Sequence, residues 1–437
     1  MRRWLKSTCK LLLFVAAGLL MLGCSRTQES DGVRLLMWSA TNPQEIDHAR
    51  ALVNAWNEAH PDTLIVLQPL PEGRSGEEVL IIAAAGKTAP DICTNIPPVI
   101  APLLADAGAL VPLDSIAGAR ESIRARMPAE LFETFVDGDG LLYQVPWKGN
   151  PILIQYNTTM LRACGVEKLP ETWSEFATAA EMVVADLDGD GGIDRWMNII
   201  NPISEWRQRL FDFYPFFIAA TGGETLLKDG QVNFDRPETE QVFAFFQQGF
   251  ERKWFSRSVF AGDAFVVGER FASRVTGPWN IAYTERFKGT DFTYEFGPIP
   301  VPDDYEGTKY TFGDPKSIGI FSTTKYPDVA WEFIEFYTSR SADLKLLEYT
   351  SQLPLRDGLL ADTLYADYFA THPRMVQFAE QVPFTRGFDQ NPVMQEVFDA
   401  LAAQFDAVCI HSRRTPEEGV ARAAERSETA LRLRGDG

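Results

Sequence analysis

Residues 33–67 read VRLLMWSATNPQEIDHARALVNAWNEAHPDTLIVL. Two apolar runs, 33–38 and 63–67, have the length and composition of buried strands. The apolar residues between these runs recur at three- and four-residue steps: Ile46, Ala49, Val53 and Trp56. That spacing gives one apolar helical face, and Asn42-Pro43 supplies an N-cap followed by proline at the first helical position. The stretch therefore predicts a β-α-β unit, a parallel sheet and an α/β fold.

The same alternation of strands and helices continues along the chain. Further strands are expected at 91–94, 142–146, 152–156, 274–276 and 317–321. Helices are expected at 77–85, 173–185, 239–251 and 415–433, and they dominate from Pro327 onward. With 437 residues, of which 45% are hydrophobic, the chain is large enough for two lobes.

The N-terminus has the features of a bacterial export signal. Arg2, Arg3 and Lys6 precede an apolar run, 11–22, that is too short to remain as a spanning helix. The block Met21-Leu22-Gly23-Cys24 resembles the bacterial lipobox, which predicts a lipoprotein signal peptide at 1–23, lipidation of Cys24 and a lipidated tether at 24–31. The alternative is an ordinary secretory signal with an incidental cysteine. The expected location is the cell envelope, on the periplasmic or extracellular face of a bacterial membrane; inner and outer membranes both stay open.

Charge and cysteine content limit the partners. The net charge is −19, and removal of 1–23, which holds four basic and no acidic residues, makes it −23. A chain this acidic is not expected to bind nucleic acid. The remaining cysteines, Cys93, Cys164 and Cys409, permit one disulfide at most, and their pairing stays open.

The segment 186–194, DLDGDGGID, matches the pattern of a calcium-binding loop. The expected ligands are the side chains of Asp186, Asp188, Asp190 and Asp194 and the backbone carbonyl of Gly192. Position 12, normally a bidentate glutamate, is Met197, so the identity of the remaining ligand is open. The alternative is a solvated Asp/Gly turn, but four carboxylates within nine residues repel one another unless a cation neutralises them. The sequence therefore predicts a structural Ca²⁺ ion.

Five further segments occur in an order that is typical of one protein family. They are 83–92 (AAAGKTAPDI), 143–146 (YQVP) with 156–157 (YN), 170–176 (PETWSEF), 277–279 (GPW) and 330–334 (AWEFI). In this order the chain resembles extracellular solute-binding protein family 1, the sugar-binding lipoprotein components of ABC transporters. The resemblance covers essentially the whole mature chain.

The resemblance implies a fold of two α/β lobes, the type II periplasmic-binding-protein fold, in which hinge strands connect the lobes. The implied crossings between lobes lie near 147–150, 274–277 and 312–317. The N-terminal lobe is then expected to comprise 32–147 and 276–316. The C-terminal lobe is expected to comprise 148–275 and 317–437.

A sugar presents apolar faces and a rim of hydroxyls, so its site needs flat aromatic surfaces and fixed polar groups. The expected ligand-binding residues are Trp38 and Ser39 at the end of the first strand, Trp147, Trp206, Trp279, Asp314 and Arg356. Weaker candidates are Thr41, Glu205, Arg207 and Arg386. Each has a competing structural interpretation, as a core tryptophan, a turn aspartate or a structural charge. Three other tryptophans, Trp56, Trp173 and Trp331, lie on apolar helical faces and are expected to be core.

These observations predict a monomeric receptor that is anchored to a membrane. It is expected to close its two lobes on a carbohydrate ligand of the oligosaccharide class and to deliver this ligand to ABC transporter permease subunits. No enzymatic activity is expected. One alternative is a secreted glycan-processing enzyme with paired carboxylates, for which no spacing in the sequence singles out a pair. Another is a surface glycan-capture lipoprotein without a transporter. The sequence does not identify the sugar, and the assignment of a sugar rests partly on the resemblance.

Overall fold

A computed structural model describes residues 32–71, 75–260 and 263–435. The predicted signal peptide at 1–23, the tether at 24–31 and the lipidation site Cys24 lie outside the described residues. Within the described ranges, no helix has both the length and the apolar content needed to cross a bilayer.

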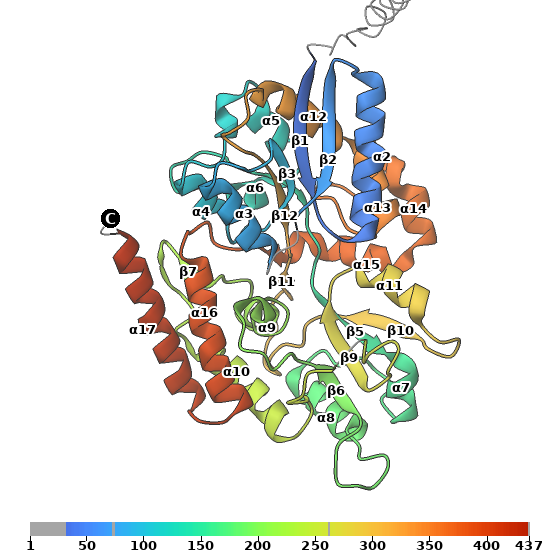
Figure 1. The fold of residues 1–437 in the computed structure, drawn as a ribbon. Coiled ribbons are helices and arrows are strands. Elements are labelled where there is room, and N and C mark those ends of the chain that lie inside the picture. Colours follow the sequence, from blue (N-terminus) through green and yellow to red (C-terminus); the bar gives the residue numbers. More distant parts are fainter. Residues whose placement is uncertain (1–31, 72–74, 261–262, 436–437) are drawn as a thin grey trace, which may run out of the picture.

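The first lobe, uppermost in Figure 1, is built on a five-stranded sheet in the order β2-β1-β3-β12-β4. Its strands are β1 (Val33–Ser39), β2 (Thr63–Pro69), β3 (Ile92–Ile96), β4 (Val145–Lys148) and β12 (Lys316–Ile320). Strand β1 pairs in parallel with both β2 and β3, which confirms the β-α-β unit, and β12 runs antiparallel to β3 and β4.

Helices cover both faces of this sheet. They are α2 (Pro43–Ala59), α3 (Gly76–Ala85), α4 (Ala101–Asp106), α5 (Ala119–Arg124), α6 (Ala129–Glu133), α12 (Pro327–Tyr337) and α13 (Arg340–Thr350), with the 3₁₀ turn η1 (Leu113–Ser115). As predicted, α2 begins at Asn42, whose side chain accepts a hydrogen bond from the Glu45 backbone N–H. Trp56 and Trp331 are buried in the core of this lobe, as expected.

The second lobe, lowermost in Figure 1, is built on a four-stranded sheet in the order β10-β5-β9-β6. The strands are β5 (Leu153–Asn157), β6 (Trp196–Ile199), β9 (Phe271–Thr276) and β10 (Tyr294–Gly297). Around it lie α7 (Thr158–Ala163), α8 (Trp173–Val183), α9 (Phe213–Ala220), α10 (Pro237–Glu251), α11 (Asn280–Phe287), α15 (Pro373–Gln381), α16 (Met394–Phe405) and α17 (Pro416–Gly435). Shorter elements are η2 (Trp206–Leu210), η3 (Thr363–Tyr365), η4 (Val382–Phe384), η5 (Asp406–Ile410), and the strands β7 (Leu227–Lys228), β8 (Gln231–Val232), β11 (Thr311–Phe312) and β13 (Thr385–Arg386).

Within the described residues, the chain passes between the lobes three times. The first crossing segment, 149–152, joins β4 to β5, and the second, 313–315, joins β11 to β12. The third, 351–372, joins α13 to α15 and contains α14 (Ala366–Thr371). Its first part returns along the first lobe, where the Asp357 N–H donates to the Arg126 carbonyl, and the chain reaches the second lobe at α15, where the Gln377 amide donates to the Phe296 carbonyl. The backbone N–H of Asn150 donates to the Gly313 carbonyl at 2.6 Å, and that of Gly149 donates to the Leu353 carbonyl at 3.0 Å. Backbone hydrogen bonds therefore join the first crossing segment to both of the others. The predicted two-lobe fold is confirmed, with crossings near two of the three expected positions.

The structure corrects the expected lobe boundaries. Residues 276–316 were assigned to the first lobe, but β10 in this range pairs with β5 of the second sheet. Residues 317–437 were assigned to the second lobe, but β12 pairs with β3 and β4 of the first sheet. No crossing occurs at 274–277, because the chain turns at Gly277-Pro278 into α11 and stays in the second lobe. The third crossing is therefore the segment 351–372, between α13 and α15.

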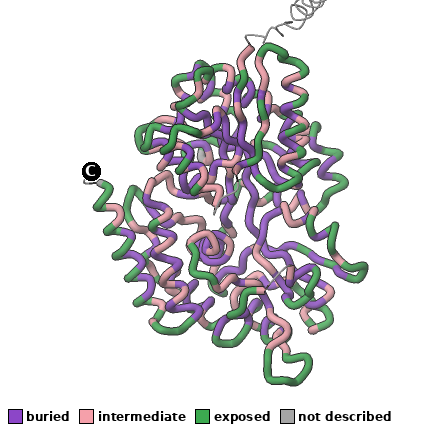
Figure 2. Tube along the Cα trace, in the orientation of Figure 1, coloured by how far each residue is buried: buried purple, intermediate pink, exposed green. Residues whose placement is uncertain are grey.

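Figure 2 shows the buried residues along the sheets and at the junction of the lobes. One large apolar cluster draws buried residues from both lobes, including Trp38 and Ile96 from the first and Phe213 and Phe398 from the second. The lobes are thus packed against each other in this arrangement. All three cysteines of the described chain are free thiols, with Cys93 and Cys409 buried.

Candidate functional site

Three of the predicted tryptophans, Trp38, Trp206 and Trp279, border one apolar cluster that draws residues from both lobes. Trp38 lies near the carboxyl end of β1 and is buried, and half-buried Trp206 and Trp279 of the second lobe pack against the same apolar cluster. The carboxyl ends of parallel strands are where open α/β sheets place their ligands. The indole Nε1–H of Trp38 is buried without a hydrogen-bond partner among the described residues. A polar ligand atom at this position would satisfy that donor. Ser39 is also buried, and its hydroxyl donates to the Ala40 carbonyl.

The position of the Trp279 ring depends on Gly277, two residues before it. A Cβ on Gly277 would lie 2.0 Å from the Trp279 ring, so only glycine allows the indole to fold back over the chain. The ring of Phe211 meets Trp279 edge-on, with centroids 6.1 Å apart. The sequence motif identified Trp279, but it did not identify Phe211, which follows η2 and carries no motif of its own.

Polar contacts join the two lobes beside these aromatic residues. The Arg207 guanidinium of η2 lies 3.5 Å from the carboxylate of Glu77 on α3. The Gln144 amide of the first lobe donates to the Gln390 side-chain oxygen of the second at 2.9 Å. Arg207 was a weaker sequence candidate, whereas Glu77 was missed. The neighbouring Glu205 is exposed and lies 3.8 Å from Arg207.

Trp147 does not border the junction, contrary to expectation. It is 2% exposed in the core of the first lobe, where its Nε1–H donates to the Thr94 carbonyl at 2.9 Å. Its ring stacks with His48 and meets Tyr337 at a steep angle. Trp147 lies inside β4, and this strand directs the indole onto the helices of its own lobe rather than toward the second lobe.

The side chains of Asp314 and Arg356 each form an ion pair with another residue of the protein. Asp314, which has a φ of +34°, accepts from the Lys316 ammonium at 2.6 Å within the second crossing segment and the start of β12. The Arg356 Nε–H donates to the Asp343 carboxylate at 2.6 Å, and its Nη2–H donates to the Thr338 carbonyl at 3.0 Å. Both side chains therefore have structural partners in the described arrangement.

A cavity of about 1120 Å³ lies between the lobes next to the third crossing segment. The first lobe lines it with residues of 128–138, and the second lobe lines it mainly with residues of 379–390. Arg356 and Arg386 also line it; the Arg386 guanidinium lies 4.1 Å from the Tyr310 ring centroid and donates to the Gly223 carbonyl. A smaller pocket of about 470 Å³ lies wholly in the second lobe, beyond the carboxyl end of β6. Of the predicted residues, Trp38, Trp206 and Trp279 thus border the aromatic cluster, and Arg356 and Arg386 line the cavity.

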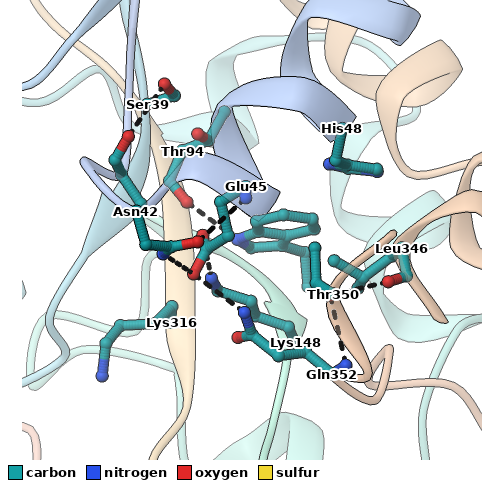
Figure 3. Close-up of polar contacts among 12 residues, drawn as sticks. Ser39, Asn42, Glu45, His48, Thr94, Lys148, Lys316, Leu346, Thr350 and Gln352 are labelled. Atoms are coloured by element: carbon teal, nitrogen blue, oxygen red, sulfur yellow. Dashed lines mark hydrogen bonds and ion pairs between the residues drawn. The ribbon is translucent and has the colours of Figure 1, made fainter. Parts of the chain in front are cut away.

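A buried polar cluster lies where the crossing segments leave the first lobe (Figure 3). The Glu45 carboxylate of α2 pairs with the Lys148 ammonium of β4, and it accepts from the side-chain amides of Asn42 and Gln352, each at 2.8 Å. Burial raises the pKa of Glu45, but the charge of Lys148 and these hydrogen bonds outweigh burial and lower the pKa to about 2. Glu45 and Gln352 carried no sequence signal.

His48 lies one helical turn beyond Glu45 and is buried between aromatic rings. Its Nδ1 lies 3.3 Å from the Tyr337 hydroxyl. Burial, assisted by the nearby Lys148 charge, lowers the pKa of His48 to about 4. The folded protein therefore holds a neutral imidazole at neutral and mildly acidic pH.

The predicted calcium loop brings three carboxylates together. Oxygens of Asp186, Asp188 and Asp194 lie within 4.8 Å of one another. Asp186 accepts from the backbone N–H groups of Gly189 and Gly191, which wraps the loop around this carboxylate. Asp190, also predicted as a ligand, is outside this group and accepts from the Gly192 backbone N–H. Three acidic oxygens in this arrangement suit a hard divalent cation.

A family model described as bacterial extracellular solute-binding protein matches residues 42–343. Among curated proteins, the chain is 24% identical to the maltotriose-binding protein of Pyrococcus abyssi over 397 residues, covering 87% of this chain and 79% of that protein.

Solved structures of binding proteins share the fold of this chain. The cyclic α-maltosyl-1,6-maltose binding protein of Arthrobacter globiformis superposes with a TM-score of 0.75 at 20% identity, covering 92% of this chain and 99% of that one. The sugar-binding protein MalE of Xanthomonas citri superposes with a TM-score of 0.74 at 20% identity, covering 92% and 98%. All of these similar proteins are binding proteins rather than enzymes.

Replacement of Trp147 tests its placement in the core. Trp147→Ala removes a fully buried indole and its hydrogen bond to Thr94, so the free energy of unfolding should fall by about 3–5 kcal/mol. Urea unfolding followed by circular dichroism measures the change. A loss below about 1 kcal/mol would place this side chain in a solvent-accessible site instead.

The lowered pKa of His48 predicts how stability varies with pH. Because the unfolded chain takes up a proton near pH 6.5 and the folded chain does so only near pH 4, stability from neutral His48 is complete above pH 6.5 and is lost as the pH falls toward 4. His48→Gln should flatten the dependence of unfolding free energy on pH by about 1.4 kcal/mol per pH unit in this window. Urea titrations of both proteins at pH 5 and pH 7 provide the comparison; equal slopes would contradict the buried neutral imidazole.

Proposed function

The chain belongs to the bacterial extracellular solute-binding protein family, and from this premise we propose that it captures an oligosaccharide between its two lobes and delivers it to an ABC importer. The observation that carries the proposal is that Trp38, Trp206 and Trp279 all border the apolar cluster that draws residues from both lobes. Indole rings suit the apolar faces of sugars, and the unpartnered Trp38 Nε1–H suits a hydroxyl of the rim.

The names of similar proteins support an oligosaccharide of the maltose type. The curated relative is a maltotriose-binding protein, and a structural neighbour from Thermus thermophilus was solved with maltotriose bound. We therefore take maltotriose as the first solute to test. The cavity of about 1120 Å³ beside the third crossing segment has room for a ligand of several sugar rings.

The proposed receptor acts as a monomer outside the cytoplasm, anchored by acyl chains on Cys24 of the lipobox-like block. Its proposed partners are the permease subunits of the importer, which recognise the closed arrangement of the lobes. Closure is an equilibrium that the solute shifts by touching both lobes at once. No covalent chemistry is part of this function.

Loss of Trp279 should weaken sugar binding without unfolding the protein. Trp279→Ala removes the half-buried indole at the junction, and removal of an aromatic anchor from a binding site costs about 2 kcal/mol, or roughly 30-fold in Kd. Isothermal titration with maltotriose, on the domain from residue 25 onward, measures the affinity. Full hydrolysis of the sugar during the titration would favour the glycan-processing alternative.

The matched control is Trp173→Ala. Trp173 is also half-buried in the second lobe, but its Nε1–H donates to the Pro300 carbonyl and its ring stacks on Phe245. This variant should lose stability and keep the wild-type Kd. If instead Trp279→Ala binds as tightly as the wild type while Arg386→Ala loses binding, the sugar occupies the cavity and not the aromatic cluster.

We further propose that the loop 186–194 binds a structural Ca²⁺ ion through Asp186, Asp188, Asp190, Asp194 and the Gly192 carbonyl. The carboxylate group formed by Asp186, Asp188 and Asp194 supports the proposal. The loop joins α8 to β6 within the second lobe, so the ion would stabilise that lobe rather than contact the solute.

Calcium should raise the melting temperature of the isolated protein. Binding to the folded state alone adds about 2.7 kcal/mol of stability when free calcium is 100 times the Kd, and EDTA should remove this gain. The double variant Asp186→Asn/Asp188→Asn should not respond to calcium or EDTA, whereas the control Asp235→Asn, an exposed carboxylate of the same lobe, should respond like the wild type. If neither calcium nor EDTA changes the melting temperature of the wild-type protein, the loop does not bind a calcium ion.

A further inference from the structure

We propose that Glu45 and Lys148 are positioning residues of the hinge: their buried pair holds the first two crossing segments and the start of the third in one geometry and thereby sets the balance between open and closed lobes. This inference rests on the proposed function, because it concerns the closure that captures the solute. The Glu45–Lys148 pair would then influence the affinity for the solute without contacting it.

Glu45 is held firmly in the first lobe. It lies in the first turn of α2, and its side chain is 11% exposed. The Lys148 ammonium pairs with one carboxylate oxygen, and the amides of Asn42 and Gln352 donate to the other. Lys148 itself is 1% exposed, so each charge is the main counterion of the other in a region closed to water.

A continuous chain of hydrogen bonds connects this pair to every crossing segment. Lys148 ends β4, directly before the first crossing segment. In the third segment, the Gln352 side-chain oxygen accepts from the Asn150 amide at 3.1 Å, and the Leu353 N–H donates to the Asn150 side-chain oxygen at 3.2 Å. The Asn150 backbone N–H donates to Gly313 of the second segment at 2.6 Å. Asn150 thus links the first segment to both of the others.

The second crossing segment also adjoins the pair through its neighbouring strand. Lys316 is paired with Lys148 in the register of β12 and β4, and the Lys316 ammonium is neutralised by Asp314. Asp314 adopts a φ of +34°, which is costly for a residue with a Cβ. The local strain marks this segment as one whose backbone conformation is imposed by its surroundings.

The network limits which residues can bend when the lobes move. Since Glu45 and Lys148 belong to rigid elements of the first lobe, their network immobilises the first two crossing segments at Asn150 and Gly313 and the start of the third at Leu353. Rotation of the second lobe must then occur beyond these residues. Loosening the network would lengthen the flexible part of each segment and admit additional lobe arrangements, which changes the fraction of molecules competent to bind.

The test removes both charges together. A single substitution would leave a buried charge without its partner and destabilise the fold, whereas Glu45→Gln/Lys148→Met keeps the side-chain volumes and leaves no charge behind. The distance between lobes is measured by double electron–electron resonance between labels on Arg50→Cys of α2 and Arg252→Cys after α10, in a Cys164→Ser background. Both labelled positions are exposed. The Kd for maltotriose is measured on the unlabelled proteins.

In the solute-free state, the double variant should show a broader or shifted distance distribution than the wild type, and its Kd should change at least threefold. The control is Arg126→Met, which removes another buried cation of the first lobe while its partner Asp343 keeps the ion pair with Arg356. The control should keep the wild-type distribution even if its melting temperature falls.

An unchanged distribution in the double variant, with a lowered melting temperature alone, would reduce the pair to ordinary structural stabilisation and overturn the proposal. The distance measurement needs no sugar, so it judges the hinge separately from the proposed function. If the wild type binds no sugar, the proposed function fails, and the distance distributions still confirm or refute the role of the pair.

Discussion

The molecule depends on one constraint: two lobes built on separate sheets are joined by crossing segments that must satisfy their own backbone polar groups. Each lobe has its own sheet, and the segments between the sheets belong to neither ladder. Their buried N–H and C=O groups pair with each other instead, as in the bonds from Asn150 to Gly313 and from Gly149 to Leu353. These bonds tie together pieces of chain that are more than 160 residues apart in one case and more than 200 in the other. These contacts help to set the relative orientation of the lobes, together with the apolar cluster that joins them.

The buried Glu45–Lys148 pair fits this constraint better than apolar residues would. A buried ion pair gains little net stability, because desolvation of both charges offsets their attraction. The pair instead restricts geometry. Because the Glu45 carboxylate accepts hydrogen bonds from Lys148, Asn42 and Gln352 at once, these side chains have few alternative arrangements. An apolar cluster of equal volume would tolerate small shifts of the crossing segments. The polar cluster therefore favours one geometry at the point where flexibility must be limited to a few residues.

The sequence predicted features that depend on neighbouring residues and missed those that depend on distant ones. The β-α-β unit of 33–67 was predicted correctly because periodicity and the Asn42 cap are local signals. The strand at 317–321 was found, but five residues carry no information about which sheet they join, so β12 was assigned to the wrong lobe. Trp147 was predicted beside a crossing, yet the pleat of β4 turns its ring into the core. The partners Glu45 and Lys148 are 103 residues apart, and no pattern in a single sequence connects them.

The aromatic cluster at the junction has a consequence for how a solute binds. Trp38, Trp206 and Trp279 already pack in one apolar cluster when the lobes are arranged as described. A sugar that stacks on these rings must replace contacts between the lobes with contacts of its own, so entry requires the lobes to separate first. The observed affinity is then a difference between two sets of contacts, reduced by the free energy of opening. A change of about 1.4 kcal/mol in that opening equilibrium alters the affinity tenfold without any change in the residues that touch the sugar. Under the proposed function, the affinity for a sugar would therefore be determined jointly by the tryptophans at the junction and by the buried pair at the hinge.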